Sequence, residues 1–118
     1  MTRINYGTRG RVYLPERFEG FVYLIRMFPL ERIYKIGWSK NPWKRLKSFT
    51  NSAMPTPNMV ALWDATRREE TAVHRHLHNG SDAVETDGIY PIENEVYGVN
   101  PELGSEEALI GHIECVIR

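Results

Sequence analysis

The stretch Gly20-Phe-Val-Tyr-Leu-Ile25, followed closely by Ile33-Tyr-Lys-Ile-Gly-Trp38, decides the fold of this chain. Both runs are rich in β-branched and aromatic residues, which favour strands, and a short insert containing a proline separates them. Two such runs this close in the sequence predict an antiparallel hairpin. Alternation along the second run places Lys35 and Gly37 on one face of the sheet and Tyr34 on the other.

The residues after this hairpin predict two helices with a strand between them. Asn41 can cap the first helix, and Pro42 suits its first position because a proline there loses no helical hydrogen bond. Residues 59–63 have the apolar composition of a third strand. The second helix starts at Thr66-Arg-Arg-Glu69, which is a capping-box pattern, and Asn79-Gly80 is a typical C-terminal stop.

The last third of the chain adds an edge strand and a terminal helix to the prediction. Residues 89–92 form the strand, and Pro91 places it at an edge because proline lacks the amide proton that a central strand needs. Ser105 precedes an amphipathic helix with two acidic residues in its first turn. The expected fold is α+β, a small β-β-α-β-α sandwich with a largely antiparallel, three-stranded sheet and a C-terminal helix.

Length and composition fit one ordinary globular domain, since 42% of the 118 residues are hydrophobic and 25% are charged. The longest apolar run, residues 21–25, is far shorter than the roughly 20 residues that cross a bilayer, and the N-terminus lacks the apolar core of a signal peptide. A single cysteine, Cys115, excludes an internal disulfide framework and fits a reducing compartment. We therefore expect no membrane partner and a cytoplasmic location, in the host cell if a phage encodes the protein.

The net charge of zero hides two halves of opposite sign. Residues 1–50 carry eleven Lys or Arg and three acidic residues, a net charge of +8, whereas residues 51–118 carry four and twelve, a net charge of −8. A phosphate-binding surface beside a cation-binding site would have this pattern, and so would two halves that interleave and pair their charges. The chain divides into a basic N-terminal arm (1–19), a central domain (20–95) and an acidic C-terminal segment with the terminal helix (96–118).

Four short motifs follow one another in the predicted elements. They are Gly20-Phe-Val-Tyr23, Tyr34-Lys-Ile-Gly37, Lys40-Asn-Pro-Trp-Lys-Arg-Leu-Lys47 and Glu70-x-x-x-His74. In this order and spacing the chain resembles the GIY-YIG nuclease superfamily, in particular the branch found in phage and microbial open reading frames. The resemblance spans residues 20–92 and implies a sandwich of the GIY-YIG type.

This resemblance implies a metal-dependent endonuclease or nickase that hydrolyses phosphodiester bonds with one Mg²⁺ or Mn²⁺ ion. Glu70 would be the metal ligand, because one carboxylate and several waters can hold such an ion. Arg45 would clamp the scissile phosphate with its fork of donors. Tyr23 and Tyr34 would line the site, one of them as general base or as the group that orients the water. His74 would act as an auxiliary base or phosphate donor.

The resemblance and the basic first helix also imply binding to nucleic acid, with DNA favoured over RNA. The residues expected to contact it are Lys35, Gly37, Lys40, Lys44 and Lys47. The lysines would neutralise backbone phosphates, and Gly37 would leave room for close approach of backbone or substrate. Because no zinc finger or helix-turn-helix motif is present, we expect low sequence specificity unless a partner supplies it.

Three alternatives stay open from the sequence. A domain of the same kind could bind nucleic acid without cutting it. A small protein-interaction factor, such as a phage-encoded inhibitor, could bind a partner through acidic residues of the C-terminal part: Glu93, Glu95, Glu102, Glu106 and Glu107. His74, His76 and His78 could hold structural zinc, although His76 leaves the helix about 160° from His74. The sequence also leaves the oligomeric state open.

Overall fold

The computed structural model of the chain describes residues 19–27, 32–50, 58–79 and 82–117. Nearly all of the predicted N-terminal arm therefore lies outside the described residues. The described elements are, in chain order, β1 (Phe21–Arg26), β2 (Ile33–Ser39), α1 (Pro42–Thr50), β3 (Asn58–Asp64), α2 (Arg67–His78), α3 (Asp82–Thr86), β4 (Ile89–Pro91), β5 (Val96–Val99) and α4 (Glu106–Val116). No helix in this part of the chain is both long and apolar enough to span a membrane.

The sheet is antiparallel throughout, with the strand order β3-β1-β2-β5-β4. The predicted α+β class and the β1–β2 hairpin are confirmed, and Tyr23 pairs with Gly37 across that hairpin. β4 with its Pro91 is an edge strand, as predicted. The prediction of a three-stranded sheet is wrong, because the described residues alone form a sheet of five strands. The unpredicted strand β5 is four residues long and contains Gly98, and both features weaken the sequence signal of a strand.

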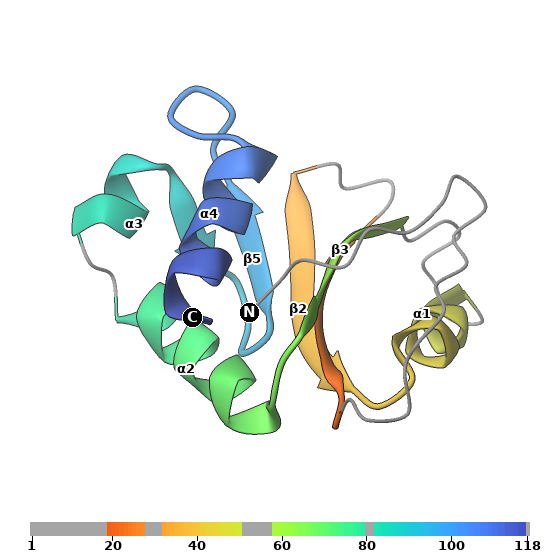
Figure 1. Cartoon of the computed structure of the whole chain (residues 1–118). Coiled ribbons are helices and arrows are strands. Elements are labelled where there is room, and N and C mark those ends of the chain that lie inside the picture. Colours follow the sequence, from red (N-terminus) through yellow and green to blue (C-terminus); the bar gives the residue numbers. More distant parts are fainter. Residues whose placement is uncertain (1–18, 28–31, 51–57, 80–81, 118) are drawn as a thin grey trace.

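Helices cover both faces of this sheet, α1 on one face and α2 with α4 on the other (Figure 1). β1 lies between β3 and β2, and its side chains are buried on both faces because helices cover both. Phe21, Tyr23 and Ile25 belong to the core under α1, whereas Val22 and Leu24 belong to the core under α2 and α4. Burial on both faces explains why β1 is a continuous apolar run instead of an alternating one.

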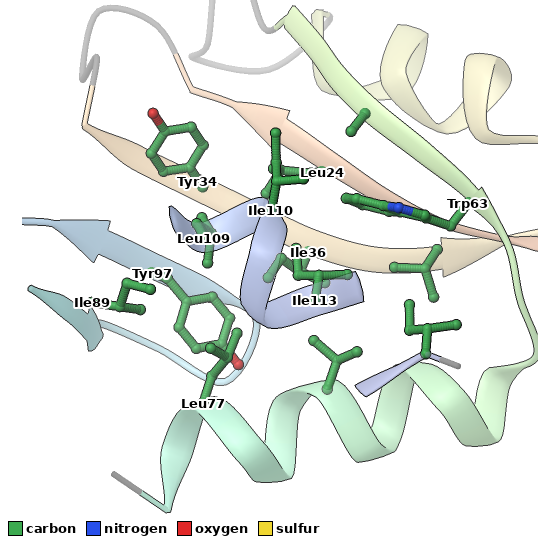
Figure 2. Close-up of a cluster of buried hydrophobic side chains, with 14 of the residues drawn as sticks. Leu24, Tyr34, Ile36, Trp63, Leu77, Ile89, Tyr97, Leu109, Ile110 and Ile113 are labelled. Carbon is green, nitrogen blue, oxygen red and sulfur yellow. The ribbon is translucent and has the colours of Figure 1, made fainter. Parts of the chain in front are cut away.

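The larger core lies between the sheet and helices α2 and α4, and Figure 2 shows its main side chains. Leu109, Ile110 and Ile113 form the buried face of α4, as the predicted apolar face of the terminal helix requires. Full burial of an aliphatic side chain of this size stabilises the fold by about 1.5–3 kcal/mol. The smaller core holds α1 through Trp43 and Leu46, so the basic side of α1 is left facing solvent.

The start of α2 is fixed by the capping box that the sequence predicted. The Thr66 hydroxyl accepts a hydrogen bond from the Glu69 amide at 3.2 Å, and the Glu69 carboxylate accepts one from the Thr66 amide at 2.9 Å. Asn79 is the C-cap of this helix. The short helix α3 that follows was not predicted. Because the cap fixes the first turn of α2, it also fixes the direction in which Glu70 leaves the helix.

Candidate functional site

A notch interrupts the sheet beside the second half of β2. β5 pairs with β2 as far as Lys35, and the next contact is a hydrogen bond from the Ile36 amide to the Glu95 carbonyl at 2.9 Å. In the described ranges, no strand pairs with residues 37–39 on the side of β2 away from β1. Side chains from α1, from α2 and from the turn before β5 meet at this notch.

Three electron-pair donors converge at the notch, supplied by Glu70, His74 and Glu95. One ligand atom from each lies within 4.8 Å of the other two. Glu70 and His74 are one turn apart on α2, with His74 Nε2 3.4 Å from Glu70 Oε2, and Glu70 is only 8% exposed. Glu95 comes from the turn before β5. Two carboxylates and an imidazole at these separations can hold a divalent cation.

Hydrogen bonds set the orientation of the His74 ring. Its Nδ1 contacts the hydroxyl of Tyr97, and this hydroxyl donates to the Asn94 carbonyl at 3.4 Å. His78 Nε2 donates to the same carbonyl at 3.0 Å, which ties the end of α2 to the turn before β5. The Tyr97 hydroxyl therefore holds the ring through Nδ1, and Nε2 is the nitrogen that faces Glu70. When it carries no proton, Nε2 can bind a metal ion.

Lys35 holds Glu95 at the notch through an ion pair of 2.6 Å between Nζ and Oε2. The Lys35 side chain is 15% exposed and that of Glu95 is 44% exposed, so the pair lies at the mouth of the notch. A depression of about 580 Å³ opens beside it, lined by Lys35, Glu93, Asn94, Glu95 and Val96. Lys35, which the sequence predicted to contact nucleic acid, here compensates the charge of a carboxylate.

Tyr23 lies against Gly37 on the α1 face of the sheet. A Cβ at residue 37 would overlap the Tyr23 hydroxyl, so this glycine makes room for the tyrosine ring. Burial raises the pKa of Tyr23, a hydrogen bond and the charge of Arg45 oppose this rise, and the charges of Glu95 and Glu70 add to it. The Tyr23 hydroxyl therefore stays protonated at neutral pH, close to an arginine from α1 and to both carboxylates. Tyr23, Arg45, Glu70, His74 and Glu95 are named the notch site below.

A basic surface lies beside the notch site on α1. Lys44, Arg45 and Lys47 of α1 are exposed, as is Lys40 just before this helix, which fits their predicted contact with phosphates. A second depression, of about 210 Å³, is lined by Ser39, Asn41, Lys44, Arg45 and Ser48. Arg45 therefore faces both this depression and the hydroxyl of Tyr23.

Tyr34 is the predicted site residue that the structure places elsewhere. It lies in the core under α2 and α4 (Figure 2), on the face opposite Tyr23, because the two residues occupy opposite positions of the strand alternation. Its hydroxyl donates to Glu106 Oε1 at 3.2 Å, and Arg26 Nη1 is 3.3 Å from the same oxygen. Burial and then the charge of Glu106 raise the pKa of Tyr34 to about 12. Tyr34, Arg26 and Glu106 are named the Glu106 cluster.

The contribution of the turn before β5 was not predicted from the sequence. Glu95 was predicted only as part of an acidic surface for a protein partner, and no role was predicted for Tyr97. A signal was present, because Val96-Tyr-Gly-Val99 is a short β-branched and aromatic run. With that run assigned as a strand beside β2, the acidic residue before it falls next to the motif residues. The number of strands was therefore the decisive error for the site.

Together, the fold and the notch site define a small α+β domain with a candidate metal centre beside a basic helix. The chain belongs to the T5orf172 domain family, whose model matches residues 20–111. This corrects the assignment to the GIY-YIG superfamily, since the matching family is a different one. T5orf172 is a phage-type domain associated with nuclease activity or nucleic-acid binding. No curated protein and no solved structure matches the chain.

Proposed function

We propose that this domain is a metal-dependent endonuclease or nickase that hydrolyses phosphodiester bonds of nucleic acid, with DNA favoured over RNA. The observation that carries the proposal is the convergence of Glu70, His74 and Glu95 within 4.8 Å, next to Tyr23 and Arg45. Three lone-pair donors this close repel one another unless a proton or a cation lies between them. The chain's family is associated with nuclease activity or nucleic-acid binding, which supports a role of these residues in phosphodiester hydrolysis.

The donor set fits one Mg²⁺ or Mn²⁺ ion. Carboxylate oxygens suit both ions, and the imidazole nitrogen of His74 favours Mn²⁺, because Mg²⁺ takes oxygen ligands almost exclusively. Glu70 and Glu95 would supply the oxygens, and Lys35 would give up its ion pair with Glu95 to make room. When bound, such an ion neutralises charge on a phosphoryl oxygen and lowers the pKa of a bound water.

Other residues of the notch site would bind the phosphate and orient the attacking water. Arg45 is exposed toward the depression on α1, where its fork of donors can bind two oxygens of the scissile phosphate. Tyr23 keeps its proton at neutral pH, so it acts as a hydrogen-bond donor that orients the attacking water or the phosphate. The Tyr97 hydroxyl holds the His74 ring in place. The general-base role predicted for His74 would use the same Nε2 lone pair and competes with its role as a ligand.

Backbone binding is assigned to the exposed lysines of the basic surface, Lys40, Lys44 and Lys47. Each lysine that neutralises a phosphate releases a counterion, so affinity should fall steeply as salt increases. The logarithmic salt slope should become shallower by about 1 for each of these lysines replaced by alanine. Such contacts carry no sequence information, which fits an enzyme of low specificity.

A cleavage assay tests this function directly. Purified protein is incubated with supercoiled plasmid and with labelled single-stranded DNA and RNA, in Mg²⁺, in Mn²⁺ and in EDTA. Nicking or cutting is expected with the metals and none with EDTA. Glu95→Gln should slow cleavage strongly, whereas the matched control Glu93→Gln should not, because Glu93 is exposed on the same turn and is not one of the three converging donors.

The outcomes separate the alternatives. Salt-sensitive binding without cutting of any substrate would replace the proposal with a domain that binds nucleic acid and does not hydrolyse it. Neither binding nor cutting would favour a protein-interaction factor. Equal rates for Glu95→Gln and Glu93→Gln would remove Glu95 from the metal centre.

A further inference from the structure

A second group of titratable side chains joins three segments of the chain away from the notch site. His76 on α2 has its Nε2 3.1 Å from Nδ1 of His112 on α4. His112 Nε2 is in turn 2.8 Å from Oδ2 of Asp87, in the turn before β4. His76 follows His74 by two residues, so it leaves α2 about 160° away from the notch site. His76 and His112 are named the histidine pair.

The contact with Asp87 sets the tautomer of His112. A carboxylate accepts hydrogen bonds and does not donate them when ionised, so the His112 proton lies on Nε2. The Nδ1 lone pair of His112 then points at Nε2 of His76. An imidazole whose far nitrogen is bonded to a carboxylate is the usual arrangement of a histidine that binds a transition metal, because the carboxylate fixes the ring and increases its basicity.

The spacing of the two nitrogens also fits a metal. Zinc–nitrogen bonds are about 2.0–2.1 Å, so two nitrogens of a tetrahedral zinc site lie about 3.3 Å apart. The separation of 3.1 Å in the histidine pair is close to this value, and the ring centroids are 5.3 Å apart with a tilt of 35° between the planes. The His112 side chain is 12% exposed and that of Asp87 is 40% exposed, so solvent can reach the site and supply water ligands.

We propose that His76 Nε2 and His112 Nδ1 form a second metal site, for a divalent transition metal of the zinc class, with water completing the coordination. Asp87 is a positioning residue that acts through His112. The site is independent of the notch site and of the proposed nuclease activity. The family match ends at residue 111, so His112 lies just outside it.

Such a metal would cross-link α2 to α4. These helices pack against each other over the larger core, and α2 also carries Glu70 and His74. A cross-link there would hold α2 in place from its far side without touching the substrate. The expected consequence is structural: the metal should stabilise the fold and leave the chemistry of the notch to its own residues.

The test is a zinc titration of the full chain that follows individual imidazoles. Long-range ¹H–¹⁵N spectra of the histidine rings are recorded as ZnCl₂ is added to the parent protein and to Glu70→Gln, which removes a donor from the notch site. The His76 and His112 resonances should shift together in both proteins. At a zinc concentration about 100 times the Kd, the unfolding midpoint should rise by roughly 10 °C.

Variants of the histidine pair complete the test. Introduced into the Glu70→Gln protein, His112→Gln and His76→Gln should each abolish the zinc-dependent rise of the midpoint, and two variants guard against one that fails to fold. Asp87→Asn should keep one zinc per pair but weaken its affinity by about 10–100-fold, the usual cost of losing a partner of a metal-bound histidine. Unchanged His76 and His112 resonances at saturating zinc would overturn the proposal and leave the pair as a hydrogen-bonded contact. Because the readouts are binding and stability, they do not depend on cleavage.

Discussion

The notch site and the Glu106 cluster contain the same three kinds of side chain, a tyrosine, an arginine and a glutamate. The partners of the glutamate carboxylate differ between the two. In the Glu106 cluster one carboxylate oxygen accepts from the tyrosine and pairs with the arginine. In the notch site the glutamate faces an imidazole nitrogen and a second carboxylate. The same residue types therefore give a closed structural contact in one place and a cation-binding geometry in the other. The difference arises because the tertiary structure brings His74 and Glu95 to Glu70 in the notch site, whereas Glu106 meets the tyrosine and the arginine of its cluster.

The strongest test of this contrast replaces the glutamate in each place. Glu70→Ala should lower the cleavage rate on the order of 1,000-fold, because stabilisation of charge by a metal ion is worth several kcal/mol and each 1.36 kcal/mol is a factor of ten. Nucleic-acid binding should stay or tighten, since a negative charge near phosphate is removed. Glu106→Ala is the matched control and should cut at the parent rate. If both variants cut equally well, the notch site is not the metal centre.

Replacing the arginines should give the next largest difference. Arg45→Ala should slow cleavage about 100-fold, as expected for loss of one donor to the reacting phosphate, and should also weaken binding. Arg26→Ala removes an arginine from the Glu106 cluster and should leave both properties unchanged. Rates come from single-turnover assays, and affinities from titrations at several salt concentrations. An Arg45→Ala variant with parent rates would show that the notch site works without a phosphate clamp.

The tyrosines give a smaller effect and separate the sequence-based prediction from the structural one. The sequence motifs predict slower cleavage for both Tyr23→Phe and Tyr34→Phe. Their positions on opposite faces of the sheet predict a loss of about tenfold for Tyr23→Phe alone, the value of one hydrogen bond to a charged group. Initial rates on the same substrate distinguish the two. A slow Tyr34→Phe enzyme with parent stability would restore Tyr34 to the site.

The smallest effect concerns stability and is absent at neutral pH. The pKa of Tyr34 is raised to about 12 in the folded protein, against 10.0 for an unperturbed tyrosine. A raised folded-state pKa contributes stability that is fully present below pH 10 and is lost as the pH rises toward 12. The loss should approach about 3 kcal/mol, from two pKa units at 1.36 kcal/mol each. Urea unfolding at pH 9 and pH 11.5 should show a steeper loss for the parent than for Tyr34→Phe.

Local patterns in the sequence predicted most of the first five elements. The β-branched runs predicted β1 and β2, the Asn41-Pro42 start predicted α1, and the Thr66-to-Glu69 capping box predicted the start of α2. These signals are local, because they depend on residues a few positions apart. β5 escaped prediction because it is short and contains a glycine, so its pairing with β2 depends on long-range contacts.

The candidate site shows the same limit. The sequence identified Tyr23, Arg45, Glu70 and His74 as residues whose chemistry belongs together, and the structure brings them to one notch. It could not identify Glu95 as their neighbour, because that depends on where the β5 hairpin docks. It also placed Tyr34 with them, since a motif records order along the chain and not the face of the sheet.

By itself the sequence determined the class of fold, the basic character of α1 and the capping box that fixes the first turn of α2, where Glu70 lies. Each of these follows from residues close together in the chain. Tertiary structure alone decided which carboxylates meet and which tyrosine joins them. It also placed His76 of α2 beside His112 of α4. Those meetings depend on sheet order and helix packing, which bring together residues tens of positions apart.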